Sequence, residues 1–241
     1  MNIKPYKTAD SAKKVQIEQM FDHIAPHYDF LNHFLSFGID RCWRRKAIGK
    51  LKSFHPGTVL DVASGTGDLA LEAFRRLKPG KIVGIDISEQ MLESGRVKLR
   101  RLGLENEIEL IKADVEKLPF ADNSFDAVMV AFGVRNFENL KQGLSEMRRV
   151  IKPGGKAVIL EFSTPSNKWF NRLYHLYSFT VLPFLGKLVS SDSSAYQYLP
   201  ESVKAFPSGT RFTGIMASVG FKNENFKELT MGIATIYFAE K

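Results

Sequence analysis

Cysteine is almost absent from this sequence, since Cys42 is the single one among 241 residues. One cysteine excludes an internal disulfide, which is typical of a chain that works in a reducing compartment. The opening residues MNIKPYKTADSAKK lack the apolar core of a secretory signal, and no stretch reaches the ~18 uninterrupted apolar residues of a membrane-spanning helix. These absences predict a cytoplasmic protein, and they leave open a peripheral contact with the inner face of the cytoplasmic membrane.

Two further kinds of site lack support in the sequence. The five histidines are scattered, and no histidine, cysteine and carboxylate cluster has the spacing of metal ligands. The net charge of +8 is spread along the chain, and no basic run is long enough for a nucleic-acid-binding arm. We therefore expect neither a metal nor a nucleic-acid partner, although the charge is compatible with attraction to an anionic membrane.

What the sequence does contain is a glycine turn after an apolar strand, in residues 59–68, VLDVASGTGD. The predicted strand ends at Asp61, and the turn that follows holds Gly65 and Gly67. Because glycine lets the backbone approach a ligand closely, such a turn opens a cofactor crevice at the carboxyl end of a strand. The next predicted strand ends at Asp86, near the ~20-residue offset of a carboxylate that accepts both ribose hydroxyls.

Dinucleotides and S-adenosylmethionine both fit this geometry, and charge distinguishes between them. Asp61 and Asp68 flank the turn, where a pyrophosphate would otherwise use the helix N-terminus. Carboxylates in these positions repel phosphate, whereas they suit an ammonium or a sulfonium group. The turn therefore predicts an S-adenosylmethionine site, and a glycine turn with a purely structural role is the simpler alternative.

The order of the predicted elements indicates an α/β fold. Residues 1–50 form a helical cap that is broken at Pro26 and Gly38. From 57 to 162, short apolar strands alternate with helices, which implies right-handed βαβ units and a parallel sheet. One helix and two strands follow, at 210–218, 221–228 and 232–239. We expect one domain, residues 1–241, built on a Rossmann-like doubly wound sheet that is mostly parallel and has an antiparallel C-terminal strand.

Further cofactor contacts are predicted from positions in such a sheet. Met91 lies one turn into the second helix, where it would cover the adenine or simply fill the core. Asp114 ends the third strand, so that its carboxylate would accept from the adenine amine and the Val115 amide would serve a ring nitrogen; capping of the next turn is the alternative. Thr66 is a candidate for the methionine carboxylate of the cofactor or for helix capping.

Several stretches of the chain are similar to known methyltransferases. The core resembles the class I S-adenosylmethionine-dependent methyltransferases, and other segments resemble the ubiquinone/menaquinone biosynthesis C-methyltransferase family. These segments are YDFLNHFLSFGIDRCWRR at 28–45, FGVRN at 132–136, RVIKPGGKAVILEFS at 149–163, YQYLPESVKAFP at 196–207 and the C-terminal LTMGIATIYF. Three positions depart from the family pattern, which usually has methionine at Leu31, often histidine at Asp40 and in some members serine at Ala131. The resemblance implies that Ala131 lies beside the cofactor.

The resemblance implies transfer of a methyl group to a carbon of a polyprenyl hydroquinone, either demethylmenaquinol or the benzoquinol of the ubiquinone pathway. A ring carbon becomes nucleophilic when the neighbouring hydroxyl loses its proton, so the enzyme must favour the phenolate. Arg135 and Asn136 are candidates for this role, and an Arg135 that is paired with an acidic neighbour is the structural alternative. Tyr28 and Asp29, on the cap, are expected to close over the acceptor, with Asp29 or Asp68 as a candidate base.

Residues 163–208 interrupt the α/β alternation with four prolines among many aromatic residues. The stretch 169–189, WFNRLYHLYSFTVLPFLGKLV, predicts a substrate lid or an interfacial helix with apolar surface for the polyprenyl tail. A lid packed on its own domain is the alternative. The sequence leaves open the ring preference, the tail length and whether the chain forms a homo-oligomer. A different small-molecule O- or N-methyltransferase is the main competing function, since the fold alone does not select the acceptor.

Overall fold

The computed structural model describes residues 3–6, 9–165, 172 and 194–241. Nearly all of the aromatic stretch predicted at 169–189 therefore lies outside the described residues. No helix in the described part of the chain has the length and apolar character needed to cross a membrane.

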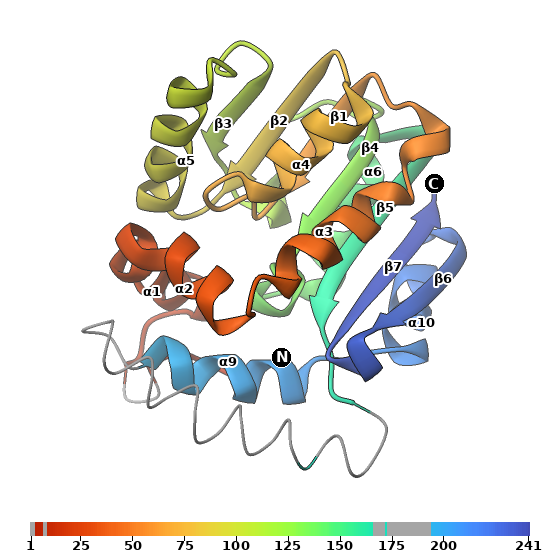
Figure 1. Ribbon diagram of the computed structural model, residues 1–241. Helices are drawn as coiled ribbons and strands as arrows, with labels where there is room; N and C mark the ends of the chain where they lie inside the picture. Colours follow the sequence, from red (N-terminus) through yellow and green to blue (C-terminus); the bar gives the residue numbers. More distant parts are fainter. Residues whose placement is uncertain (1–2, 7–8, 166–171, 173–193) are drawn as a thin grey trace.

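Seven strands in the described ranges form one sheet in the order β3-β2-β1-β4-β5-β7-β6 (Figure 1). The first five strands pair in parallel, whereas β7 runs antiparallel to both of its neighbours. The strands are β1 Thr58–Val62, β2 Lys81–Asp86, β3 Ile108–Lys112, β4 Phe125–Ala131, β5 Ile151–Phe162, β6 Lys222–Leu229 and β7 Ala234–Glu240. This arrangement confirms the predicted doubly wound, mostly parallel sheet.

Helices cover both faces of the sheet, as the alternation of strand and helix requires. Apolar residues of α3, α4 and α5 pack on one face, and those of α6 and α10 pack on the other. The helices are α1 Lys13–Ile24, α2 Tyr28–Leu35, α3 Ile39–Gly49, α4 Asp68–Leu77, α5 Glu89–Leu102, α6 Leu140–Val150, α9 Ser194–Ala205 and α10 Thr210–Ser218. The predicted limits of α10, 210–218, are confirmed to the residue.

The helical cap consists of α1, α2 and α3. Of these, α1 and α2 lie at the carboxyl ends of the first strands, and α3 crosses one face of the sheet (Figure 1). The two predicted breaks are confirmed. Pro26 lies in a short 3₁₀ turn, Ala25–His27, and Gly38 has a φ of 72° directly before α3. Because an L side chain is strained at that φ, glycine allows the sharp corner between α2 and α3.

Some strand boundaries differ from their predictions by one or two residues: the strands expected at 221–228 and 232–239 are β6 Lys222–Leu229 and β7 Ala234–Glu240. A further irregularity lies at the start of β5, which begins at Ile151 directly after α6 ends at Val150. The pairing of β4 with β5 shifts register before Ala127, so residues 152–155 form an irregular first part of the strand. Gly155 fits this irregularity, since a Cβ there would come within 2.6 Å of the Asp126 carbonyl oxygen.

Candidate functional site

A cavity lies at the carboxyl ends of the first four strands, beneath the cap. Parallel strands bring their carboxyl ends to one edge of the sheet, which is why loops far apart in the sequence meet there. The predicted site residues that line this cavity are Tyr28, Gly65, Asp86, Met91, Asp114, Val115, Ala131 and Asn136. The predicted residues Asp29, Asp61, Thr66, Gly67, Asp68 and Arg135 do not line it, and they lie around it in the arrangements described below.

The glycine turn has the backbone that the sequence indicated. Gly65 and Gly67 have φ values of 55° and 82°, in the left-handed region where glycine is favoured. A Cβ on Gly65 would lie 3.1 Å from Cε of Met91, so a larger residue would crowd both the turn and α5. Met91 is buried and lines the cavity, which is compatible with covering a ligand and with filling the core.

Asp86 ends β2 and lines the cavity. Its Oδ2 accepts a hydrogen bond from the Gly65 amide at 2.9 Å, and its Oδ1 accepts one from the Ser88 amide at 2.9 Å. These bonds hold the carboxylate against the glycine turn while each oxygen keeps a second lone pair for a ligand hydroxyl. Enclosure by the protein raises the pKa of Asp86 to about 6.

Asp61 lies in β1, one residue before the strand ends, and is 1% exposed. Within the described residues, no donor makes a hydrogen bond of good geometry to either oxygen of its carboxylate, although the Ser64 hydroxyl and the Ala70 amide lie near enough to oppose part of the rise in its pKa. Burial raises the pKa of Asp61 to about 7. A buried carboxyl group without a donor costs stability, and such groups are characteristic of sites that bind a ligand. The donor that would satisfy Asp61 is a cationic or N–H group at the adjacent turn.

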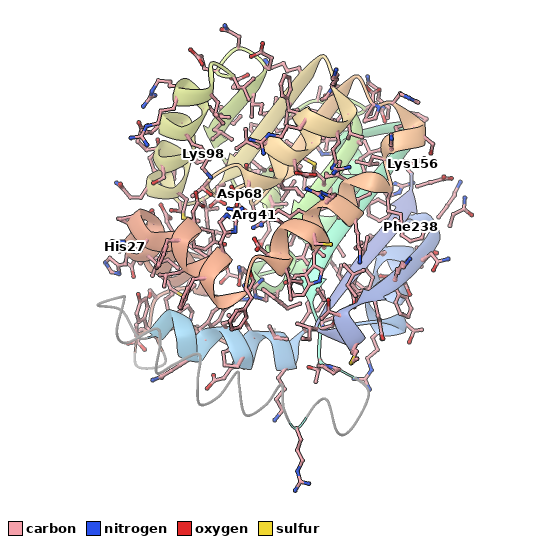
Figure 2. The ribbon with its side chains drawn as sticks, in the orientation of Figure 1. His27, Arg41, Asp68, Lys98, Lys156 and Phe238 are labelled. Atoms are coloured by element: carbon pink, nitrogen blue, oxygen red, sulfur yellow. The ribbon has the colours of Figure 1, made fainter. Side chains whose placement is uncertain are left out.

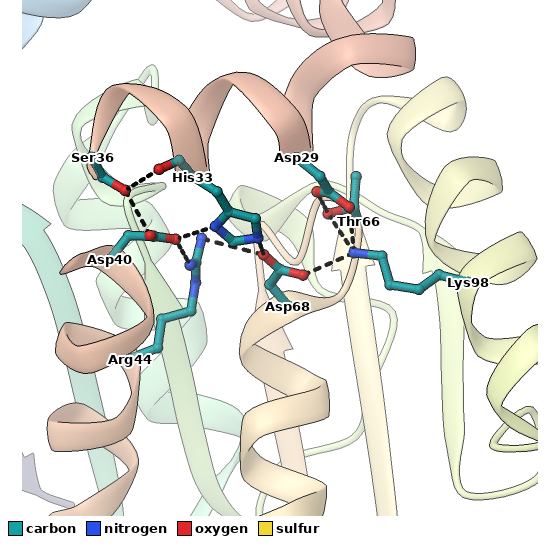
Figure 3. A network of polar contacts seen from close by, with 8 residues as sticks. All are labelled: Asp29, His33, Ser36, Asp40, Arg44, Thr66, Asp68 and Lys98. Carbon is teal, nitrogen blue, oxygen red and sulfur yellow. Dashed lines mark hydrogen bonds and ion pairs between the residues drawn. The ribbon is translucent and has the colours of Figure 1, made fainter. Parts of the chain in front are cut away.

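The second carboxylate of the turn, Asp68, already has cationic partners (Figure 3). Its Oδ1 lies 2.8 Å from Lys98 Nζ on α5, and its Oδ2 lies 3.7 Å from an Arg44 nitrogen on α3. Burial alone would raise the pKa of Asp68, but Arg44 and Lys98 together hold it below its usual value. The ion pairs of Asp68 therefore connect the glycine turn to the cap and to α5. The spacing of these residues in the sequence does not indicate this contact. Figure 2 shows Asp68 and Lys98 where the cap meets the sheet.

Asp29 and Thr66 belong to the same network. The Thr66 hydroxyl donates to Asp29 Oδ1, and Lys98 Nζ lies 2.6 Å from Asp29 Oδ2 (Figure 3). Thr66 therefore binds the cap, and the side chain does not cap α4, which begins after Gly67 without a side-chain cap. The predicted contact of Thr66 with the cofactor would have to use its backbone, because this bond engages the hydroxyl.

The network continues along the cap to Asp40, which is 3% exposed. Asp40 accepts hydrogen bonds from Ser36 at 2.6 Å and from Arg44, and its Oδ2 lies 2.9 Å from Nδ1 of His33. Asp40 therefore has a full set of partners within the cap. His33, Asp40 and Asp68 also bring possible metal-ligand atoms within 4.8 Å of one another, but Arg44 supplies the positive charge between the two carboxylates. The pair Asp40 and Arg44 has the i,i+4 spacing of a helical ion pair, a signal that the sequence does contain.

Asp114 has the turn-capping role that was its alternative, and its predicted contact with adenine stays a prediction. Its Oδ1 caps the next turn by accepting from the Glu116 amide at 2.9 Å, and the residue also lines the cavity. Its Oδ2 lies 2.6 Å from Nζ of Lys14, a residue of α1 that lines the same cavity. The neighbouring Lys13 is buried, donates to the carbonyls of Arg135 and Phe137, and has its pKa lowered to about 8 by burial. Two consecutive lysines thus join α1 to the site, and sequence reasoning did not identify either.

The segment FGVRN lies in and directly before a 3₁₀ turn, Val134–Asn136. Arg135 forms the paired arrangement that was its structural alternative: Nη1 lies 2.8 Å from Oε1 of Glu161, and both side chains are buried. Asn136 lines the cavity, and its Oδ1 accepts from the Tyr198 hydroxyl of α9 at 3.0 Å. Since Oδ1 is engaged, the amide nitrogen of Asn136 is the group that remains to donate.

Tyr28 connects the cap to the cavity. It lines the cavity from the start of α2 and packs edge-on against Phe21, with ring centroids 6.0 Å apart. Burial raises the pKa of the Tyr28 hydroxyl, so the phenol stays protonated near neutral pH. Its contact with Phe21 supports the packing role, and its place in the cavity also leaves it within the proposed acceptor site.

Comparison with known proteins identifies similar chains. The profile of the ubiE/COQ5 methyltransferase family matches residues 8–241. A demethylmenaquinone methyltransferase of Bacteroides fragilis is 53% identical over 99% of this chain and 97% of its own. A ubiquinone/menaquinone biosynthesis C-methyltransferase of Geotalea daltonii is 52% identical over 98% of this chain and 100% of its own. A solved SAM-dependent methyltransferase of Thermotoga maritima has a TM-score of 0.65 and 21% identity, over 92% of this chain and 99% of its own, which supports the fold alone.

Proposed function

Because the chain belongs to the ubiE/COQ5 methyltransferase family, we propose that it uses S-adenosylmethionine to methylate a ring carbon of demethylmenaquinol, which yields menaquinol. The observation that carries this proposal is the identity of about half of all residues, over nearly the full length, to a protein named for that reaction. The benzoquinol of the ubiquinone pathway is the second candidate acceptor, since the Geotalea daltonii relative is named for both pathways.

The donor set around the cavity fits S-adenosylmethionine. Asp61 has an unsatisfied buried carboxyl group that suits the ammonium of the methionine part. Asp86 has free lone pairs for the ribose hydroxyls, and Asp114 and Val115 would serve the adenine. When bound, this cofactor supplies an electrophilic methyl group on a sulfonium.

The chain must also stabilise the phenolate of the acceptor. We assign this task first to Asn136, because Tyr198 holds its Oδ1 and thereby presents its amide nitrogen as a donor. Glu161 neutralises the charge of Arg135, so the guanidinium serves mainly to position the turn that carries Asn136. Asp29 is engaged by Thr66 and Lys98, which makes it a weaker candidate for the base than a free carboxylate would be.

The acceptor carries a polyprenyl tail, which remains in the lipid bilayer because it is apolar. The proposal therefore includes peripheral contact of the enzyme with the inner face of the cytoplasmic membrane. The cavity lining itself supports an aromatic acceptor, since Phe21, Tyr28, Phe132 and Phe137 border it.

The direct test is methyl transfer from labelled S-adenosylmethionine to chemically reduced demethylmenaquinol and, in parallel, to the reduced benzoquinol precursor. Product from demethylmenaquinol alone would establish an enzyme of menaquinone biosynthesis, and product from both acceptors would establish an enzyme of both quinone pathways. Asn136→Asp should bind the cofactor normally and turn over at least about tenfold more slowly, because a carboxylate repels the phenolate. Retained cofactor binding with turnover of neither acceptor by the unmodified enzyme would favour an O- or N-methyltransferase.

A further inference from the structure

The outer side of α2 exposes large apolar side chains. Phe30 and Phe34 are 61% and 51% exposed and lie one turn apart on α2, and Phe37, which follows the helix, is 82% exposed. The rings of Phe30 and Phe34 stack with centroids 5.7 Å apart. Together with Ile39, the three phenylalanines account for four of the seven large hydrophobic side chains that are exposed in the described ranges. Exposed apolar surface is therefore concentrated at residues 30–39, which we call the phenylalanine ridge.

The fold does not need these side chains where they are. The opposite side of α2 makes its contacts with the molecule, since Tyr28 lines the cavity, Asp29 binds Thr66 and Leu31 is buried. Phe37 has a φ of 51°, a conformation in which glycine or asparagine would be less strained than a phenylalanine. A cluster of exposed aromatic side chains that packing does not require is typical of an interaction surface.

Exposed basic side chains also lie on α3, the helix that follows the phenylalanine ridge in the chain. Arg41, Arg45 and Lys46 are exposed, and the chain as a whole carries a net charge of +8. Arg45 approaches Glu72 at 3.8 Å, whereas Arg41 and Lys46 have no ion-pair partner among the residues that the structure describes. Figure 2 shows Arg41 on the cap beside α2. Exposed aromatic rings on one helix and exposed cations on the helix that follows it suit the two layers of a lipid surface, the acyl boundary and the anionic headgroups.

We propose that the phenylalanine ridge and the adjoining cations of α3 seat the enzyme on an anionic phospholipid bilayer. This inference rests on the proposed function, because the polyprenyl acceptor is dissolved in that bilayer. The helix that would touch the lipid is also the one that carries Tyr28 into the cavity, so docking places the site next to the source of its substrate. A second copy of the chain fits this surface less well, since a symmetric contact would bring Arg41 and Lys46 of both copies together.

The test compares vesicle binding of matched variants. The unmodified protein should co-sediment with vesicles of phosphatidylglycerol and phosphatidylcholine at low salt, and much less with phosphatidylcholine alone. Phe30→Ser, Phe34→Ser and Phe37→Ser combined should weaken this partitioning at least about tenfold. Leu102→Ser with Met231→Ser, which removes exposed apolar residues elsewhere, should leave it unchanged. Arg41→Glu with Lys46→Glu should also weaken it about tenfold, whereas Lys222→Glu with Lys227→Glu on β6 should weaken it less.

A second measurement separates this inference from the proposed function. Turnover of a short-tailed, water-soluble demethylmenaquinol should be equal in the unmodified and triple-serine proteins, and turnover of the vesicle-borne acceptor should fall in the variant. Failure of the unmodified enzyme to methylate either acceptor would reject the proposed function, while the sedimentation result would still decide the docking surface. The docking proposal is overturned if the unmodified protein ignores anionic vesicles, or if the triple-serine protein binds them equally well. A shift from dimer to monomer in the triple-serine protein, with vesicle binding retained, would assign the ridge to a second copy instead.

Discussion

Arg135 and Glu161 form a buried ion pair that joins the FGVRN turn to the end of β5, with Nη1 2.8 Å from Oε1. Glu161 Oε2 also accepts from the Arg135 amide at 3.1 Å, and the Arg135 side chain donates to the Phe132 carbonyl. Both charged groups are therefore committed to holding the turn, and Asn136 follows directly from it.

Removing one partner of this pair should be far more costly than removing both. Glu161→Ala leaves a buried guanidinium without a carboxylate, and we expect a loss of about 3–5 kcal/mol in the free energy of unfolding. Arg135→Met with Glu161→Met should cost clearly less than the sum of the single changes. Urea unfolding of the unmodified protein, Arg135→Met, Glu161→Met and the double methionine variant gives the coupling energy. Additive single effects would show that the two residues act independently.

Asp61 should reduce the stability of the unliganded protein. Its pKa of about 7 when folded exceeds the ~3.9 of an unfolded chain, so the folded state binds this proton more tightly. Stability therefore falls as pH rises from about 4 to about 7, and above pH 7 the charge costs up to about 4 kcal/mol. Asp61→Asn should be more stable than the unmodified protein at pH 8, with a difference that shrinks toward pH 4. Denaturant unfolding at both pH values tests this, and an asparagine variant less stable at pH 8 would contradict it.

Cofactor affinity should depend on the same proton. A bound ammonium next to Asp61 favours the carboxylate, so binding requires the loss of the proton that the free protein holds below pH 7. We expect S-adenosylhomocysteine to bind about tenfold more weakly at pH 6 than at pH 8. Calorimetric titration in buffers of different ionisation enthalpy would reveal the released proton. Asp61→Asn should bind weakly at both pH values, and an equal affinity of the unmodified protein at pH 6 and pH 8 would exclude this linkage.

Lys98 should hold the cap against the glycine turn. It lies 2.6 Å from Asp29 and 2.8 Å from Asp68, and its side chain is 24% exposed, so part of the electrostatic gain is screened by solvent. Lys98→Met should cost about 1 kcal/mol of stability and speed amide exchange in α2. Lys81→Met, which removes the exposed pair with Glu109, is the matched control and should cost almost nothing. Equal rates of amide exchange in α2 of both variants would show that Lys98 does not specifically hold the cap against the glycine turn.

Substitution of alanine for glycine should have opposite effects at two helical positions, Gly95 and Gly214. A Cβ on Gly95 of α5 would lie 2.6 Å from Leu110 Cδ1 and 3.1 Å from the Thr66 backbone, so Gly95→Ala should displace the glycine turn and weaken cofactor binding. Gly214 of α10 has open space around it, and Gly214→Ala should stabilise the protein by about 0.5–1 kcal/mol. Thermal unfolding and cofactor titration of both variants distinguish the effects, and an unchanged affinity in Gly95→Ala would refute the crowding.

Much of the architecture followed from local patterns. The period of apolar residues and the positions of Pro26 and Gly38 predicted the cap helices, and the strand and helix alternation predicted the parallel sheet. The glycine turn and Asp86 could be recognised because close backbone approach and the strand-end carboxylate depend on residue type and spacing alone. These features depend only on residues that are close together in the sequence, so a single sequence is enough to predict them.

The partners of each charged group were decided by tertiary structure. Nothing in the spacing of Asp29, Asp68 and Lys98 indicates that α2, α4 and α5 converge on one point, or that Lys14 reaches Asp114. The charge of Asp68 appeared available to a ligand in the sequence, whereas packing of the cap provides it with protein cations. The strength of an ionic interaction depends on the distance between the charges and on their burial. Both are set only when segments that are remote in sequence are brought together. Local sequence patterns were therefore enough to predict the fold and the glycine turn of the cofactor site. Only the packed structure shows which carboxylates near that turn are left without a protein cation and can bind the cofactor.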